Sequence, residues 1–245
     1  MSRINWNNNK VKGLETISKD GVGPTILVIP GILADYRYPL FFAEKLYGEN
    51  PILAFNFGGH STCDKKVVLD EAVISEMTFQ DEIDQLSDIA KTIDGTYLTM
   101  SFSHGFLVDG FAYREGVINP FRRIGLSPIC SRKDWLEIRN SEYRNDWKVK
   151  RFGPYIGDRI LDITKVDFRK DTRFDVYHAG DVTVVVLHGT KDEFYYGEFD
   201  EKIGYNDIDE LTGDDVKVIK CEDEGHVFSP RSCIRAIKKH GNSMT

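Results

Sequence analysis

Long apolar runs and a signal segment are both missing from this sequence. No stretch approaches the roughly 18 uninterrupted apolar residues that a membrane-spanning helix needs. The N-terminal residues contain neither the apolar core nor the small-residue cleavage site of a secretory signal. We therefore expect a cytoplasmic protein without a membrane span. Its composition, 41% hydrophobic and 29% charged, is that of a globular chain.

Paired cysteines and phosphate-binding loops are also missing. The cysteines at 63, 130, 221 and 233 are too scattered for a zinc knuckle or a redox motif, so we expect reduced thiols. No cluster of histidines and carboxylates has metal-ligand spacing. The glycine pair at 58–59 lacks the Lys-Ser or Lys-Thr of a P-loop, and no Gly-x-Gly-x-x-Gly opens a helix. We therefore expect no metal, no other cofactor and no bound nucleotide.

The chain as a whole has no excess of positive charge. Its formal net charge of −7 repels nucleic-acid phosphates, so we expect no nucleic-acid partner. Residues 131–178 depart from this balance, because Lys and Arg outnumber Asp and Glu there. This local excess indicates either a solvated surface of mixed charge or a region that receives an anionic substrate.

Apolar runs alternate with amphipathic segments along most of the 245 residues. Strands are expected at residues 25–29, 51–55, 97–100, 123–127, 182–187 and 216–219. Helices are expected at residues 36–47, 78–93, 105–113 and 229–239. Continuous apolar strands are typical of sheets buried on both faces. The alternation predicts an α/β fold with a mostly parallel central sheet and helices on both faces.

Two segments lie outside this alternation. Residues 3–6 and 11–18 predict an N-terminal hairpin, with its turn at the Asn-Asn-Asn-Lys cluster of residues 7–10. Residues 131–180 are charged and aromatic, contain no strand-like run, and are predicted to be an insertion. The core domain is then formed by residues 1–130 and 181–245.

A candidate nucleophile lies between an expected strand and an expected helix. Residues 101–105 read Ser-Phe-Ser-His-Gly, with Ser103 flanked at two residues by the small Ser101 and Gly105. A nucleophile on so sharp a turn adopts a strained backbone, and only small residues at these two positions avoid collisions with neighbouring elements. The alternative is an ordinary turn that joins a strand to a helix.

This pattern resembles the α/β-hydrolase family, whose nucleophile turn is usually Gly-x-Ser-x-Gly, and the resemblance extends over most of the chain. Ser101 stands where the family usually has glycine. The family's chain order is Ser, acid, His. The resemblance implies Asp192 as the acid, in Leu-His-Gly-Thr-Lys-Asp after a strand, with Glu193 as its rival. It implies His226, in a Gly-His pair before the last helix, as the base.

The implied chemistry is nucleophilic catalysis at the carboxyl ends of parallel strands, where open α/β sheets place their sites. His226 would take the proton of the weakly nucleophilic Ser103 hydroxyl, while Asp192 would orient the imidazole. The resemblance also implies an oxyanion hole formed by the backbone N–H groups of His104 and Ile32, with Leu33 as the alternative to Ile32.

The insertion falls where the family commonly carries a helical lid. Its aromatic residues Trp135 and Trp147 are candidates for substrate contact, and the alternative is that they only pack the lid onto the domain.

Taken together, the residues and the resemblance predict a hydrolase that cleaves a carboxylic ester or thioester of a small-molecule acyl substrate through an acyl-enzyme. An acyltransferase on the same scaffold and a catalytically silent binding protein are the alternatives. The sequence leaves the oligomeric state open.

Overall fold

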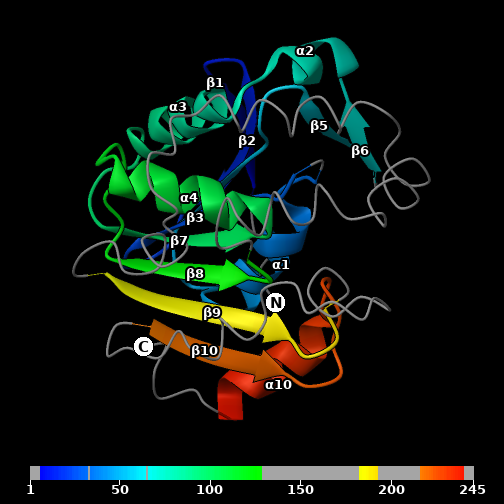
Figure 1. Cartoon of the computed structure of the whole chain (residues 1–245). Helices are drawn as coiled ribbons and strands as arrows, with labels where there is room; N and C mark the ends of the chain where they lie inside the picture. Colours follow the sequence, from blue (N-terminus) through cyan, green and yellow to red (C-terminus); the bar gives the residue numbers. More distant parts are fainter. Residues whose placement is uncertain (1–5, 33, 65, 129–181, 193–215, 240–245) are drawn as a thin grey trace.

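The computed structural model describes residues 6–32, 34–64, 66–128, 182–192 and 216–239 (Figure 1). In this part of the chain eight strands form one sheet, in the order β1-β2-β4-β3-β7-β8-β9-β10. The strands are β1 Asn7–Val11, β2 Leu14–Lys19, β3 Thr25–Ile29, β4 Ile52–Phe55, β7 Tyr97–Phe102, β8 Arg122–Leu126, β9 Thr183–Gly189 and β10 Val216–Cys221. The pairings from β4 through β3 to β10 are parallel, and β2 is antiparallel to both β1 and β4. The expected mostly parallel sheet is confirmed.

The central strand β3 shows why the core has two layers. Because successive side chains of a strand point to opposite faces, Leu27 and Ile29 belong to one hydrophobic cluster and Ile26 and Val28 to the other. All four side chains are fully buried. The continuous apolar run in the sequence is therefore required by a sheet that is covered on both faces.

Helices cover both faces of this sheet. The residues of α3, Phe79–Ala90, and α4, His104–Arg114, share the cluster of Leu27, and the two helices lie side by side (Figure 1). The helices α1, Arg37–Leu46, and α10, Pro230–Lys239, contact each other and share the other cluster. All four were expected from the sequence, with bounds that differ by a few residues.

β1 and β2 form an N-terminal hairpin, but its turn was predicted in the wrong place; of the expected first strand, residues 3–6, only Trp6 is described, and it is not in a strand. Residues 7–10 are in β1, and the turn is formed by Lys12 and Gly13, whose φ angles are +48° and +87°. Two consecutive residues with positive φ give a tight turn whose twist matches that of the flanking strands. The asparagine cluster is tolerated in β1 because, among the described strands, this edge strand pairs only with β2, and its side chains are mostly exposed.

A second hairpin and a short helix follow β4 and were not predicted. The strands β5, His60–Cys63, and β6, Lys66–Leu69, pair antiparallel, and α2, Glu71–Glu76, comes next. Only one side chain of β5, that of His60, is buried, and none of β6 is. With so few buried side chains these strands need no long apolar run: β5 has none, and β6 has only Val67, Val68 and Leu69.

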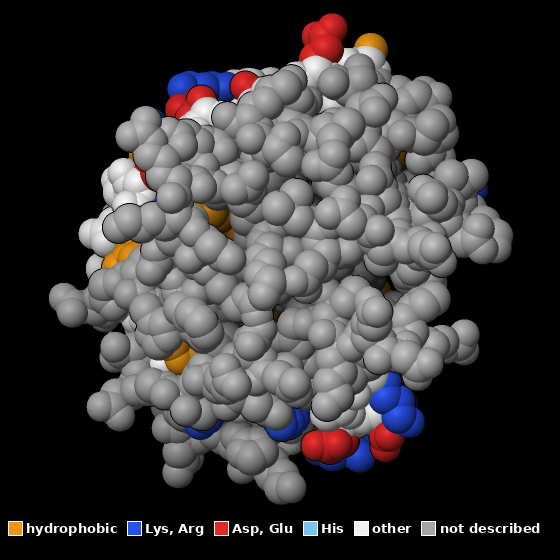
Figure 2. Space-filling model, viewed as in Figure 1, with side chains coloured by type: hydrophobic (Ala, Val, Ile, Leu, Met, Phe, Trp, Pro, Cys, Tyr) orange, Lys and Arg blue, Asp and Glu red, His pale blue; other side chains and the backbone are white. Residues whose placement is uncertain are grey.

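The predicted lid, residues 131–180, lies outside the described residues, as do Trp135 and Trp147. No helix in the described ranges is long and apolar enough to cross a membrane. In Figure 2, basic and acidic side chains of the described residues lie next to one another at the upper and lower rim of the molecule. Surface ion pairs include Lys191–Asp223, which is exposed, and Lys12–Asp88, in which Asp88 is half-buried; both have 2.7 Å between nitrogen and oxygen.

Candidate active site

Three loops at the carboxyl ends of parallel strands bring the implied trio into contact. Ser103 follows β7, Asp192 follows β9 and His226 follows β10. The Nε2 atom of His226 is 2.9 Å from the Ser103 hydroxyl oxygen, and its Nδ1 atom is 2.9 Å from Asp192 Oδ2. The rival acid Glu193 and the alternative oxyanion donor Leu33 lie outside the described residues.

The contacts of the His226 ring define the direction of proton movement. A carboxylate can only accept hydrogen bonds, so the bond to Asp192 places the imidazole proton on Nδ1. The lone pair of Nε2 then faces the Ser103 hydroxyl, which donates to it. Asp192 is fully buried, while Ser103 and His226 keep 5% and 6% of their surface exposed. The arrangement can therefore deprotonate a serine in a nearly dry site.

Ser103 has the strained backbone that the sequence predicted for it. As the N-cap of α4 it has φ +52° and ψ −122°, and a non-glycine residue in such a conformation costs about 1–3 kcal/mol. The turn is held by the Ser103 N–H, which donates to the Leu126 carbonyl at 2.9 Å, and by the Phe106 N–H, which donates to the Ser103 carbonyl at 3.0 Å. Neighbouring structure therefore maintains the strain at this residue.

The two glycines near Ser103 permit close packing of the loop that follows β3. A Cβ atom on Gly105 would lie 2.2 Å from the Pro30 carbonyl oxygen, and one on Gly31 would lie 2.9 Å from the Phe102 ring. The loop is thus pressed against the nucleophile turn. The loop carries Ile32, which is half-buried, and α4 begins at His104. Main-chain N–H groups at a helix start have no partner within the helix and can bind an anion.

Ser101, which replaces the commoner glycine, has a hydrogen-bond partner in the core. Its hydroxyl donates to Asp109 Oδ2 at 3.3 Å, as does the Thr99 hydroxyl at 3.1 Å and the Arg123 Nε at 3.0 Å. Asp109 and Arg123 are almost completely buried. Burial raises the pKa of the Asp109 carboxyl, and the Arg123 guanidinium with the two hydroxyls offsets this only in part. These hydrogen bonds connect β7 with α4 and β8.

His104 is tied to helix α3. Its Nε2 atom lies 2.6 Å from Glu82 Oε2, and both side chains are almost fully buried. Its ring also packs edge-on against that of Phe79, with 5.7 Å between the ring centres. The sequence predicts only a main-chain role for His104 and does not predict the contact with Glu82. The only signal for Glu82 was a carboxylate in the first turn of an amphipathic helix.

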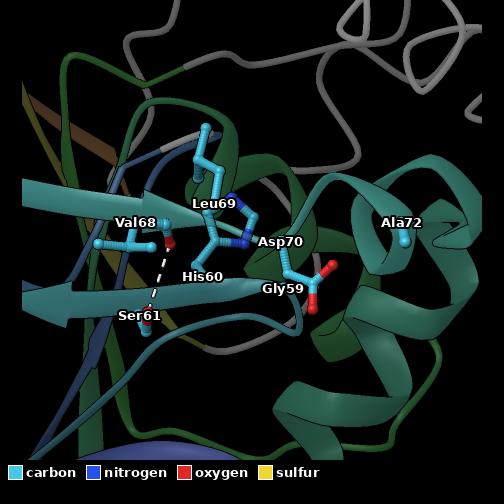
Figure 3. Close-up of a pocket in the computed structure, with 7 residues that line it drawn as sticks. All are labelled: Gly59, His60, Ser61, Val68, Leu69, Asp70 and Ala72. Atoms are coloured by element: carbon cyan, nitrogen blue, oxygen red, sulfur yellow. Dashed lines mark hydrogen bonds between the residues drawn. The ribbon is translucent and has the colours of Figure 1, made fainter.

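A separate cavity of about 690 Å³ lies at the hairpin of β5 and β6 and includes His60 and Asp70 (Figure 3). The His60 Nδ1 is 2.9 Å from the Gly58 carbonyl oxygen, and the Asp70 carboxylate accepts the Val73 N–H at the start of α2. These polar groups stabilise the hairpin and α2. No member of the trio lines this cavity, and the described residues contain no group of three or more His, Cys, Asp and Glu able to hold a metal ion.

Comparisons with known proteins found similarity in structure only. No protein-family model and no curated protein matches the chain. Mouse alpha/beta hydrolase domain-containing protein 10 is 16% identical with a TM-score of 0.61, and the match covers 97% of each chain. An esterase from Thermogutta terrifontis is 15% identical with a TM-score of 0.63, and the match covers 97% of this chain and 98% of the esterase. A thioesterase domain from the curacin biosynthetic pathway is 12% identical with a TM-score of 0.63, over 100% of both chains. Similarity at this level of identity shows a shared fold.

Proposed function

We propose that this chain, which has the α/β-hydrolase fold, is a serine hydrolase that cleaves a carboxylic ester or thioester through an acyl-enzyme. The observation that carries the proposal is the pair of 2.9 Å contacts that link Asp192 to His226 and His226 to Ser103. In this assignment Ser103 is the nucleophile, His226 the general base and Asp192 the acid that orients it.

In the first half-reaction the Ser103 oxygen attacks the carbonyl carbon of the substrate while its proton passes to His226 Nε2. The backbone N–H groups of His104 and Ile32 are proposed to stabilise the oxyanion of the tetrahedral intermediate. When that intermediate collapses, the bond to the leaving oxygen or sulfur breaks, and Nε2 returns the proton to the departing alcohol or thiol. The acyl group remains on Ser103.

In the second half-reaction a water molecule replaces the leaving group. His226 takes a proton from the water as it attacks the acyl carbon, and a second tetrahedral intermediate forms. Its collapse breaks the bond to Ser103, which regains its proton from Nε2, and releases a carboxylic acid. The buried Asp192 stabilises the imidazolium in both half-reactions, because little water surrounds the two side chains.

An esterase and a thioesterase domain are among the similar structures, which supports an ester or thioester as the bond that is cleaved. The proposed lid, with Trp135 and Trp147, would contact the acyl or leaving group of the substrate. An acyltransferase would use the same first half-reaction and replace water by an alcohol or amine.

The proposal is tested by labelling with a fluorophosphonate, which reacts with an activated serine, and by hydrolysis of p-nitrophenyl esters of graded acyl length. We expect the wild type to be labelled and active, and Ser103→Ala to be neither. Ser61→Ala is the matched control, because Ser61 is an exposed serine of β5 outside the trio. Absence of labelling in the wild type, or equal labelling of Ser103→Ala, overturns the proposal. Faster transfer to an added alcohol than to water identifies an acyltransferase.

A further inference from the structure

Two hydroxyl groups from distant elements hold the main chain around His226. The Ser127 hydroxyl donates to the carbonyl oxygen of His226 at 2.6 Å, and the N–H of Phe228 donates to the Tyr38 hydroxyl at 2.8 Å. Ser127 follows β8 and Tyr38 lies in α1. His226 itself lies between the end of β10 and the start of α10, outside regular structure. Side-chain contacts from elsewhere in the fold therefore help to position it, together with main-chain hydrogen bonds such as that from the Lys191 N–H to the Glu224 carbonyl.

The end of β8 contacts both the proposed nucleophile and the proposed base. The carbonyl of Leu126 accepts the N–H of Ser103 at 2.9 Å, and the next residue, Ser127, donates to the carbonyl of His226. The Ser127 N–H in turn donates to the carbonyl of Leu187, a residue of β9, at 2.8 Å. Two consecutive residues thus fix the main chains of Ser103 and His226 relative to each other.

The backbone of Ser127 indicates that its side chain is needed. Ser127 has a φ of +44° and is fully buried. Glycine adopts such a conformation at no steric cost, whereas serine adopts it with strain. The Ser127 hydroxyl donates to the His226 carbonyl, and glycine at this position could not form that bond.

The imidazole of His226 also packs against an aromatic ring. The Phe102 ring lies 5.3 Å from the His226 ring and 4.5 Å from the Tyr38 ring, measured between ring centres. Phe102 directly precedes Ser103 in the chain. Tyr38 therefore supports the loop of His226 twice, through its hydroxyl on Phe228 and through the ring of Phe102.

We propose that Ser127 is a positioning residue that holds His226 at hydrogen-bonding distance from Ser103. The inference rests on the proposed function, because it concerns the histidine of that same site. A displacement of about 1 Å at a reacting group can cost about 100-fold in rate. Loss of the Ser127 hydroxyl therefore lowers the rate of acylation, while substrate binding by other parts of the protein is unchanged.

The test compares Ser127→Gly and Ser127→Ala with the wild type in ester hydrolysis and fluorophosphonate labelling. We expect kcat and the labelling rate to fall about 10- to 100-fold in both variants, with KM nearly unchanged. Ser127→Gly removes the hydroxyl and relieves the positive φ, so its thermal midpoint is expected to be no lower than that of Ser127→Ala. If Ser127→Gly is stable but has lost activity, the loss is due to the position of His226 and not to unfolding.

Ser87→Ala is the matched control. Ser87 is also a buried serine whose hydroxyl donates to a distant main-chain carbonyl, that of Val117, at 3.4 Å. It lies in α3 and does not contact the trio, so we expect kcat to stay within about twofold of the wild type. A readout that needs no turnover is the downfield proton resonance of His226 Nδ1–H, which we expect to broaden or shift in Ser127→Gly and to be unchanged in Ser87→Ala.

The outcomes distinguish failure of the positioning role of Ser127 from failure of the proposed hydrolase function. Wild-type kcat and labelling in Ser127→Gly overturn the positioning role and leave the proposed function intact. A rise in KM at constant kcat overturns it as well, because the hydroxyl would then act on binding. If both Ser127 variants unfold, the hydroxyl is a folding requirement and the positioning role is rejected. A wild-type protein that does not react with the fluorophosphonate overturns the proposed function, and the role of Ser127 with it.

Discussion

The imidazole of His104 lies 2.6 Å from the carboxylate of Glu82, in a contact that is closed to solvent. It joins the residue after the proposed nucleophile to helix α3. Glu82→Ala would leave the buried imidazole without this partner, and such a loss costs about 1–3 kcal/mol. We therefore expect a lower free energy of unfolding, measured from urea denaturation, and a smaller loss in Glu82→Gln, whose amide oxygen still accepts a hydrogen bond.

The control for this prediction is Asp84→Ala in the same helix. Asp84 is exposed, and its carboxylate accepts a hydrogen bond from the Gln80 side chain at 3.1 Å. We expect its removal to change the free energy of unfolding by less than about 0.5 kcal/mol. The prediction for Glu82 is wrong if Glu82→Ala is as stable as Asp84→Ala.

Asp109 predicts a particular dependence of stability on pH. Burial raises the pKa of its carboxyl above the ordinary 3.8, so the folded protein retains a proton that the unfolded chain has released. The free energy of unfolding contributed by this group therefore falls as the pH rises from about 4 through the raised pKa. Asp109→Asn cannot titrate at this position and should lack that decline.

Urea denaturation of wild type and Asp109→Asn between pH 4 and pH 8 measures this difference. We expect the stability of the wild type, relative to the variant, to be greatest at the acid end and to decline with pH. The opposite slope would mean that attraction to Arg123 outweighs the cost of burial and that the pKa of Asp109 is lowered. Either slope is read from the difference between the two proteins, which removes the contribution of groups that they share.

Gly105 should be intolerant of any side chain. In Gly105→Ala the new Cβ atom would lie 2.2 Å from the Pro30 carbonyl oxygen, so α4 and the loop after β3 must separate. Overpacking of this kind costs about 1–3 kcal/mol. The shift would also move the N–H groups proposed to bind the oxyanion. We expect a lower thermal midpoint together with a loss of kcat in p-nitrophenyl ester hydrolysis.

Gly116→Ala is the control for Gly105→Ala, because it introduces backbone strain at a distance from Ser103. Gly116 has a φ of +71° and free space around its Cβ position, so alanine there costs about 1–2 kcal/mol without a collision. It follows the end of α4, at the opposite end of that helix from Ser103. We expect Gly116→Ala to lose stability but keep kcat. Equal effects of the two substitutions on kcat would show that general destabilisation explains both.

The structural elements that the sequence predicted correctly are those marked by a pattern among neighbouring residues. Continuous apolar runs such as Thr25–Ile29 exist because both sheet faces are buried, and the capping pair of Thr78 and Asp81 is visible at a spacing of three. The small residues around Ser103 are likewise local. An edge strand such as β1 needs no apolar run, so its asparagines predict a turn where the structure has a strand.

The supports of the candidate site have no such local signal. Ser127 and His226 are 99 residues apart, and Tyr38 and Phe228 are 190 apart. Each hydrogen bond depends on the sheet order and on the end point of a strand, which no spacing along the chain reveals. The contact of His226 with Asp192 was expected only through a family resemblance. The residues that hold His226 in place became visible only with the fold.

Tyr38 provides an independent test of how the loop of His226 is held. Tyr38→Phe removes the hydroxyl that accepts the Phe228 N–H and keeps the ring that packs on Phe102. We expect kcat to fall a few-fold, less than in Ser127→Gly, because Phe228 is two residues from the imidazole. Since both hydroxyls hold one loop, their effects should not be additive, and the double variant should lose kcat by a factor that differs from the product of the single losses. A double-mutant cycle on the acylation rate measures this coupling, with Ser87→Ala combined with Tyr38→Phe as the uncoupled reference. Strict additivity in both cycles would mean that Ser127 and Tyr38 act on different parts of the structure.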